Sequence, residues 1–100
     1  MSERCFEIVL YKVRDADEAR AARKQIMPFL ARHPGFRSWR ALVDLKDSAQ
    51  FMDLIEWDTV QDAEVAAETI MRDPAFAAFM GQIELVQSMS HYRQAGSIAA

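Results

Sequence analysis

A few ionisable side chains interrupt stretches of sequence that are otherwise apolar and suited to buried strands. They are Glu7, Arg40, Asp53, Glu56, His91 and Arg93. Burying an ionised group without a partner is costly, so each is expected to have an ion-pair partner, a position at a sheet edge or a place in a ligand pocket. These residues are therefore the first candidates for chemistry.

Glu7 and His91 form the strongest candidate pair. If residues 82–93 form a strand antiparallel to residues 4–13, His91 lies within one or two residues of Glu7 across the ladder. A carboxylate beside an imidazole raises the pKa of the imidazole and orients the ring, as a general acid/base pair requires. The alternative is a salt bridge at the sheet rim or at a dimer interface, which is the commoner role of such a pair.

Three aromatic residues and one arginine are candidates for binding a substrate. The aromatic residues are Tyr11, Trp39 and Tyr92, which suit the wall of an aromatic pocket or the binding of substrate oxygen atoms. Packing in a core or interface is the commoner role of such residues. Arg40 suits a carboxylate ligand held by two hydrogen bonds, and the alternative is an ion pair with Glu56.

Composition argues against several other functions. Two histidines without spaced carboxylate partners make no metal site, and three glycines form no phosphate loop, so we expect neither a metal nor another cofactor. The single cysteine, Cys5, cannot form an intramolecular disulfide and is expected to pack in the core. Twelve basic and fifteen acidic residues give a net charge of −3 without a basic cluster, which argues against nucleic acid.

No apolar run approaches the roughly 20 residues of a membrane span, and the first residues lack the order of a signal peptide. A membrane partner is therefore not expected. A lone cysteine is typical of a reducing compartment, so we expect a cytoplasmic protein.

Local signals place six main elements along the chain. Strands are predicted over 4–13, 36–45, 51–57 and 82–93, with a polar turn over 46–49. A first helix begins after the capping pattern at 15–18, is expected to kink or restart at Pro28, and ends at His33-Pro34-Gly35. A second helix is capped by Asp58 or Thr59, and a short one starts at Asp73-Pro74. Residues 95–100 are expected to form a loose tail.

This βαββαβ order predicts a single α+β domain over 1–100, a ferredoxin-like sandwich with a four-stranded antiparallel sheet and a core over about 4–93. The first and third strands are expected to be central and parallel to each other, with the fourth and second strands antiparallel beside them. Both central strands are apolar at consecutive positions, which predicts burial of both sheet faces. Two helices can cover only one face, so the other is expected to bind a second copy of the chain.

Several short motifs resemble those of the dimeric α+β barrel superfamily, and within it the antibiotic-biosynthesis-monooxygenase-like group. They are His33-Pro34-Gly35-Phe36, Ser38-Trp39, Ile55-Glu56-Trp57-Asp58, and Asp73-Pro74 with Phe76. The resemblance covers residues 4–93 and rests on caps, turns and core aromatics. It implies that two sheets meet face to face in a homodimer, and that a ligand pocket lies between the sheet and the helices of one subunit.

The resemblance also implies a range of activities, because the superfamily includes cofactor-free oxygenases, haem-degrading enzymes, lactone isomerases and dehydratases. The haem-degrading branch uses an Asn, a Trp and a His whose positions here fall on a strand without Asn, near Ala66, and near Phe79 or Met80. That branch is therefore disfavoured. The Asn and Trp pair of the cofactor-free oxygenases also finds no match on the second helix.

Two functions follow as hypotheses. The first is a small enzyme that acts on an aromatic or carbonyl-bearing metabolite without a metal or organic cofactor, with Glu7 and His91 exchanging protons and Arg40 or Tyr92 placing the substrate. The second is a non-catalytic dimer that binds a small ligand or serves as an accessory subunit. The fold alone does not choose between them.

Overall fold

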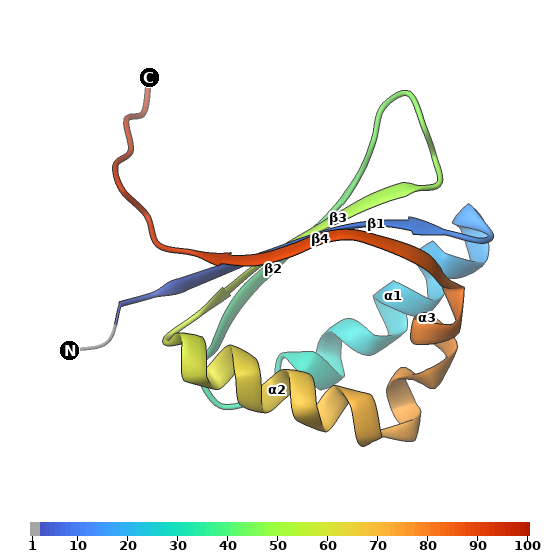
Figure 1. Cartoon of the computed structure of the whole chain (residues 1–100), viewed down its shortest axis with the longest axis horizontal. Helices are drawn as coiled ribbons and strands as arrows, with labels where there is room; N and C mark the ends of the chain where they lie inside the picture. The colour runs from blue at the N-terminus through green and yellow to red at the C-terminus, as the bar shows by residue number, and fades with distance from the viewer. Residues whose placement is uncertain (1–2) are drawn as a thin grey trace.

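A single four-stranded sheet carries all of its helices on one face (Figure 1), in a computed structural model that describes residues 3–100. The elements are β1 (Cys5–Val13), α1 (Ala16–Leu30), β2 (Phe36–Val43), β3 (Gln50–Trp57), α2 (Val60–Arg72), a 3-10 turn η1 (Pro74–Phe76), α3 (Ala77–Gln82) and β4 (Ile83–Tyr92). The predicted βαββαβ order and ferredoxin-like sandwich are confirmed.

The sheet has the order β2-β3-β1-β4, and every neighbouring pair is antiparallel. The predicted central position of β1 and β3 is confirmed, but their predicted parallel orientation is wrong. Each crossover through a helix joins two strands that run in the same direction, β1 to β2 and β3 to β4. In the sheet a strand of the other crossover lies between them, so the parallel strands are not neighbours.

Capping residues define where the helices begin. The Asp15 carboxylate accepts a hydrogen bond from the Glu18 N–H at 2.9 Å, and the Thr59 hydroxyl accepts one from the Asp62 N–H at 3.1 Å. The helix α1 continues through Pro28 to Leu30. Proline lacks the N–H that would bond to the carbonyl of residue 24, and its ring crowds that carbonyl, but the helix does not restart here and ends two residues later.

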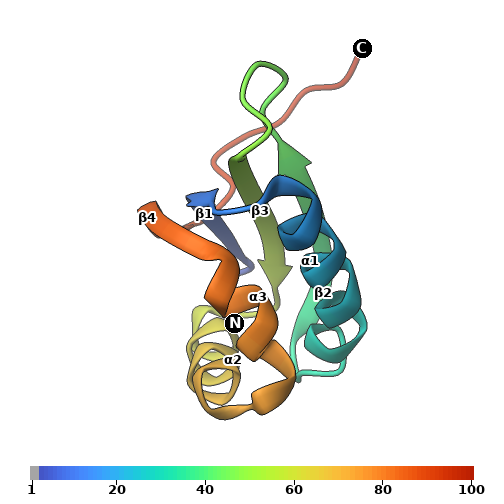
Figure 2. The same ribbon diagram turned by 90° about the vertical axis from the view of Figure 1, so that its right-hand side faces the viewer.

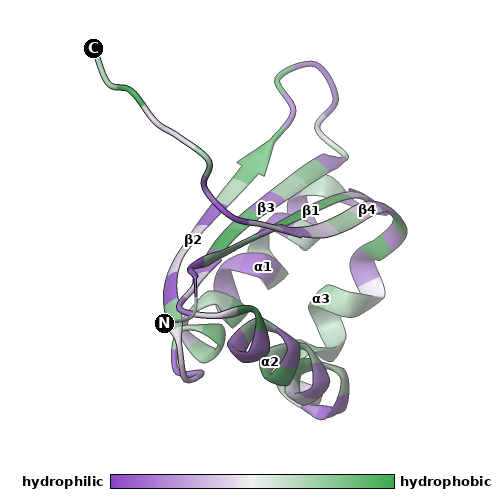
Figure 3. Ribbon diagram, turned by 60° about the vertical axis from the view of Figure 1, so that its left-hand side comes forward, coloured by the Kyte–Doolittle hydropathy of each residue, from purple (hydrophilic) through white to green (hydrophobic). Residues whose placement is uncertain are grey.

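The two sheet faces differ in what covers them. Along β3, the residues at 51, 53, 55 and 57 are buried beneath the helices, and the alternate residues are half-buried on the other face. Phe6, Ile8 and Leu10 of β1, with Met52 and Leu54 of β3, are also only half-buried. We name this second side the open face. Figure 3 shows hydrophobic stretches along both central strands.

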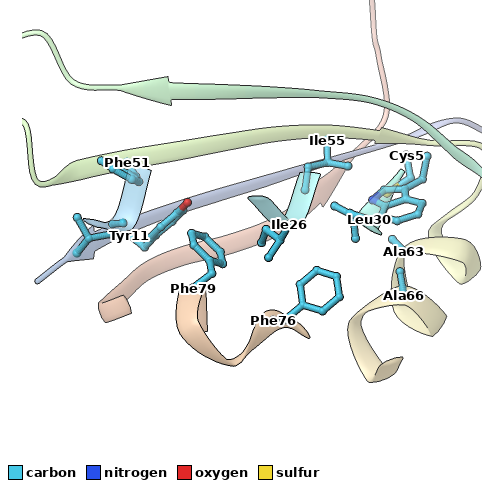
Figure 4. Packing of buried hydrophobic residues seen from close by; sticks show 13 residues of the cluster. Cys5, Tyr11, Ile26, Leu30, Phe51, Ile55, Ala63, Ala66, Phe76 and Phe79 are labelled. Carbon is cyan, nitrogen blue, oxygen red and sulfur yellow. The ribbon is translucent and has the colours of Figure 1, made fainter. Parts of the chain in front are cut away.

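The core lies between the sheet and the helices. Seen from the end in Figure 2, α3 lies between α1 and α2. Aromatic rings from three elements meet there: Tyr11 packs edge-on against Phe51 and Phe79, with ring centroids 5.8 and 5.9 Å apart (Figure 4). The small residues Ala63 and Ala66 are the buried side of α2, so that this helix adds little volume to the core.

In residues 3–100, no helix has the length and apolar character needed to cross a membrane. Residues 93–100 form neither helix nor strand.

Candidate functional site

A cavity of about 200 Å³ lies between the sheet and the helices. Its walls are mainly aliphatic and aromatic, and five polar or amphipathic side chains take part: Glu7, Tyr11, Trp39, Asp53 and Trp57. A cavity of roughly 150 Å³ lined by aliphatic and aromatic residues can hold benzene. The volume therefore suits a small aromatic or alicyclic molecule.

Methionines from three elements line the part of the cavity that reaches solvent. Met71 at the end of α2, Met80 in α3 and Met89 in β4 are 78%, 42% and 48% exposed, respectively. Because these exposed residues also belong to the cavity wall, the route to solvent runs between α2, α3 and β4. Methionine is flexible and polarisable, so such a rim adapts to ligands of different shape.

The strand register brings four residues on the helix side of the sheet into one row, and three of them line the cavity. His91 on β4 lies opposite Glu7 on β1, Glu7 lies opposite Ile55 on β3, and Ile55 lies opposite Trp39 on β2. The expected proximity of Glu7 and His91 is therefore confirmed. Both lie on the helix side of the sheet and away from the open face.

The Glu7 carboxylate is buried and has two close neighbours. Its Oε1 accepts a hydrogen bond from Trp57 Nε1 at 3.0 Å, and His91 Nε2 is 4.0 Å from the same oxygen. Burial raises the pKa of Glu7, against the lowering effects of the Trp57 hydrogen bond and the His91 charge, while Asp53 raises it further. A carboxyl with a raised pKa is a stronger base once ionised, which suits proton abstraction.

A second polar cluster joins α1 to β1 and β3 beside the cavity. Tyr11 donates a hydrogen bond to Asp53 Oδ2 at 2.8 Å, and Arg23 Nη1 donates to Asp53 Oδ1 at 3.1 Å. The Arg23 side chain is 4% exposed and that of Asp53 is 6% exposed. Burial raises the pKa of Asp53, against the lowering effects of the Tyr11 hydrogen bond and the Arg23 charge. The pKa of Tyr11 is also raised, mainly by burial.

Trp39 brings an N–H group to the cavity wall. Its Nε1 atom is buried, and within residues 3–100 no protein atom accepts a hydrogen bond from it. The group lies near enough to Asp53 to help lower the pKa of that carboxyl. The pair nevertheless falls outside hydrogen-bond geometry.

Arg40 and Tyr92 lie outside the cavity. Arg40 is opposite Leu54 and Tyr92 is opposite Phe6, so both belong to the open face. The alternative expected for Arg40 was an ion pair with Glu56. In the part of the chain that the structure describes, Glu56 pairs instead with Arg37 at 3.1 Å and with Arg4 at 3.6 Å. Since side chains alternate along a strand, Arg40 and its neighbour Trp39 point to opposite faces.

His91 and Tyr92 also line a second hollow of about 420 Å³ at the chain ends. Its walls come from residues 3–5 and 91–93, with Val60 and Gln61 from the start of α2. Most of these side chains are exposed, so the hollow is a surface groove. His91 thus lies between this groove and Glu7.

Two contributors to the site were not predicted from the sequence. Arg23 follows Ala19 by four residues and precedes Ile26 by three, so it continues the buried stripe of α1, and an arginine at such a position was the available signal. The spacing of Phe29 from Ile26 also predicts a place in the apolar stripe of this helix, but the Phe29 side chain is 44% exposed. No sequence signal indicated that Trp57 would donate to Glu7.

Among the residues from 3 to 100, no group of three or more His, Cys, Asp or Glu side chains is arranged to hold a metal ion. The thiol of Cys5 is buried, and burial raises its pKa. A raised pKa disfavours the nucleophilic thiolate, so Cys5 packs in the core as expected.

Sequence comparison and structural comparison give different results. No protein-family model and no curated protein matches the sequence. Among solved structures, a candidate antibiotic biosynthesis monooxygenase from Bordetella bronchiseptica superposes with a TM-score of 0.81 at 14% identity, over 93% of this chain and 98% of that one. A variant of SnoaB, a cofactor-independent oxygenase from Streptomyces nogalater, gives a TM-score of 0.79 at 13% identity, over 99% and 100% of the two chains.

A third structure of this kind, a candidate antibiotic biosynthesis monooxygenase from Nitrosomonas europaea, gives a TM-score of 0.76 at 15% identity, over 95% of this chain and 93% of that one. At such low identity the similarity concerns the backbone and carries no residue roles. This protein therefore shares the fold of these solved structures.

Proposed function

We propose that this protein is a cofactor-independent, monooxygenase-like enzyme that removes a proton from a small aromatic or carbonyl-bearing molecule. The observation that carries the proposal is the position of Glu7 and His91, which lie side by side on the helix side of the sheet where the apolar cavity begins. A basic carboxylate beside an apolar, aromatic-walled cavity is suited to a substrate with an acidic C–H group.

The two residues have different surroundings, which supports different roles. Glu7 lines the cavity, whereas His91 lines the groove at the chain ends. Glu7 would take the proton from the substrate, and His91 would exchange it with solvent. Transfer of this kind requires the 4.0 Å separation between Oε1 and Nε2 to shorten when the ligand binds, as catalytic contacts commonly do.

The oxygenation step would use electrons of the substrate itself. Proton loss leaves a carbanion conjugated with the carbonyl group, and dioxygen accepts its electron pair to form a new C–O bond. After protonation the hydroperoxide loses water, so that a CH₂ group and O₂ become a C=O group and H₂O. The substrate is oxidised and dioxygen is reduced, and no other oxidant is required.

A ketone probe tests this proposal with the wild-type protein. The compound 2-indanone has acidic methylene hydrogens between a ring and a carbonyl group. In deuterium oxide the protein is expected to accelerate exchange of these hydrogens above the rate in buffer, and in air to consume one dioxygen for each indane-1,2-dione formed. Nuclear magnetic resonance and an oxygen electrode measure the two rates. Binding of the probe without accelerated exchange would contradict an enzymatic role.

One observation favours a second candidate, a non-catalytic binding protein. The Glu7 oxygen that lies nearest to His91 is already bonded to Trp57, and the distance to His91 exceeds that of a hydrogen bond. In that case Glu7 would be a buried structural acceptor, and the protein would bind the ketone without exchanging its protons.

We also propose that the protein is a homodimer joined through the open face. Half-buried apolar residues from the two central strands form this face, and Leu42 on β2 is 44% exposed beside them. Arg40, Lys12 and Glu56 supply charges of both signs, which a twofold axis can pair. A chain of this length gains appreciably from an interface, since alone it buries only ~60–70% of its unfolded surface.

The substitution Ile8→Asp tests the dimer. Ile8 is half-buried on the open face, opposite Leu54 on β3 and Ser90 on β4, so a carboxylate there would be buried in the interface without a cation directly opposite it. Sedimentation at micromolar concentration is expected to give a dimer for the wild type and a monomer for the variant. Val65→Asp is the control, because Val65 is 57% exposed on α2 and should leave the dimer intact. A wild-type monomer would contradict the proposal.

A further inference from the structure

The cavity has one hydrogen-bond donor that the rest of the protein leaves unused. Of the polar groups in its wall, Tyr11 donates to Asp53 and Trp57 donates to Glu7, while the two carboxylates are acceptors. Trp39 Nε1 is buried, and although the Asp53 carboxylate lies nearby, no atom of residues 3–100 accepts a hydrogen bond from it in hydrogen-bond geometry. Buried donors in folded proteins are nearly always satisfied, so such a group calls for an explanation.

The position of Trp39 in the sheet explains its unpaired N–H. Trp39 and Glu7 lie in the same row, separated by Ile55, and all three side chains are in the cavity wall. Neighbouring strands are about 4.8 Å apart, so the backbones of Glu7 and Trp39 are about 10 Å apart. A flat molecule lying over Ile55 would therefore meet the carboxylate on one side and the indole N–H on the other.

We propose that Trp39 is the specificity-determining residue of the cavity, and that its N–H binds a carbonyl or phenolate oxygen of the ligand. The inference deepens the proposed function and rests on it for the identity of the reacting group. It names the substrate class as a flat ketone or phenol whose oxygen is conjugated with the acidic carbon. When Glu7 removes the proton, negative charge would move to this oxygen, where a donor stabilises it.

The neighbouring cluster explains why Trp39, and not Tyr11, has this role. The Tyr11 hydroxyl donates to Asp53 and lies 3.4 Å from Arg23 Nη1, from which it accepts. Its single proton is therefore already used. Asp53 is in turn held by Arg23, which does not belong to the cavity wall.

The substitution Trp39→Phe tests the inference with two probes of similar shape, 2-indanone and the hydrocarbon indane. Ligand-observed magnetic resonance titration is expected to show that the variant binds the ketone roughly 3- to 10-fold more weakly, the usual worth of one hydrogen bond. Indane should bind the wild type and the variant with nearly equal affinity, because the hydrocarbon has no oxygen to accept a hydrogen bond. An equal loss for both probes would assign Trp39 to packing alone and overturn the inference.

The indole proton gives an independent readout. The chain has two tryptophans, so the Trp39 signal is assigned as the one missing from the variant. Addition of 2-indanone is expected to shift this signal downfield, and indane is not. A Trp39 signal unmoved by the ketone at saturation would contradict the inference. Ketone-selective binding without proton exchange would instead overturn the proposed enzymatic function and leave the role of Trp39 intact.

Discussion

Glu7→Gln is expected to slow the exchange of 2-indanone protons by roughly 10²–10⁴-fold, the usual contribution of a general base. The amide has nearly the same shape as the carboxylate and can still accept the Trp57 hydrogen bond, but it cannot take a proton. Binding of 2-indanone should therefore change little. The measurement is the rate of deuterium incorporation at saturating probe, with affinity determined separately, so that a loss of rate is not confused with a loss of binding.

Glu56→Gln is the matched control. Glu56 lies on β3 next to Trp57 and is half-buried, but its side chain belongs to the open face and pairs with Arg37. Its exchange rate should equal that of the wild type. If Glu7→Gln retains the wild-type rate, Glu7 is a structural acceptor and the base must be sought elsewhere.

The same variant has a stability signature with a definite sign. The pKa of Glu7 is raised in the folded state above its ordinary value of about 4.5, so the folded protein binds the proton more tightly than the unfolded chain. Stability therefore falls as pH rises from about 4.5 to the raised folded-state pKa. Because an amide does not titrate, the free energy of unfolding of Glu7→Gln should fall less over this interval. If the variant is less stable than the wild type by a similar amount at every pH, the substitution has caused a folding defect.

The fold was largely predictable because its signals are local. Asp15 and Thr59 begin the helices, the residue after Pro34 adopts a φ of +82° that favours glycine, and the consecutive apolar residues of β1 and β3 indicate two sheet faces in need of cover. The orientation of β1 relative to β3 was missed. It depends on which strands become neighbours, and this is a property of the whole topology.

The candidate site was predictable only where the strand register determines which residues lie opposite each other. Glu7 and His91 could be placed opposite each other because an antiparallel ladder pairs the start of one strand with the end of the other. Side-chain direction decided the rest: Trp39 and Tyr11 face the cavity, whereas Arg40 and Tyr92 face away. Contacts such as Trp57 with Glu7 join residues 50 positions apart and depend on the packed structure.

Arg23→Met is expected to destabilise the protein by roughly 3–5 kcal/mol, because it leaves the Asp53 carboxylate buried without its cation. Arg23 bonds to Asp53 and to the Leu42 carbonyl at 3.3 Å, and its guanidinium lies 4.1 Å from the centre of the Phe51 ring. Chemical denaturation measures the loss. Arg20→Met on the same helix is the control, because its ion pair with Asp17 is exposed and should be worth about 0–1 kcal/mol.

A second substitution, together with the pH dependence of stability, distinguishes the contribution of the Arg23 charge from that of its packing. Asp53→Asn combined with Arg23→Met removes both charges, so the double variant should recover much of the stability that Arg23→Met loses. Burial already raises the pKa of Asp53, and loss of the arginine should raise it further. In Arg23→Met, stability should then decline as pH rises from the ordinary Asp range to this new pKa, so the deficit relative to wild type is smallest in acid. A deficit that stays constant with pH and survives in the double variant would show that Arg23 stabilises the core through packing on Phe51.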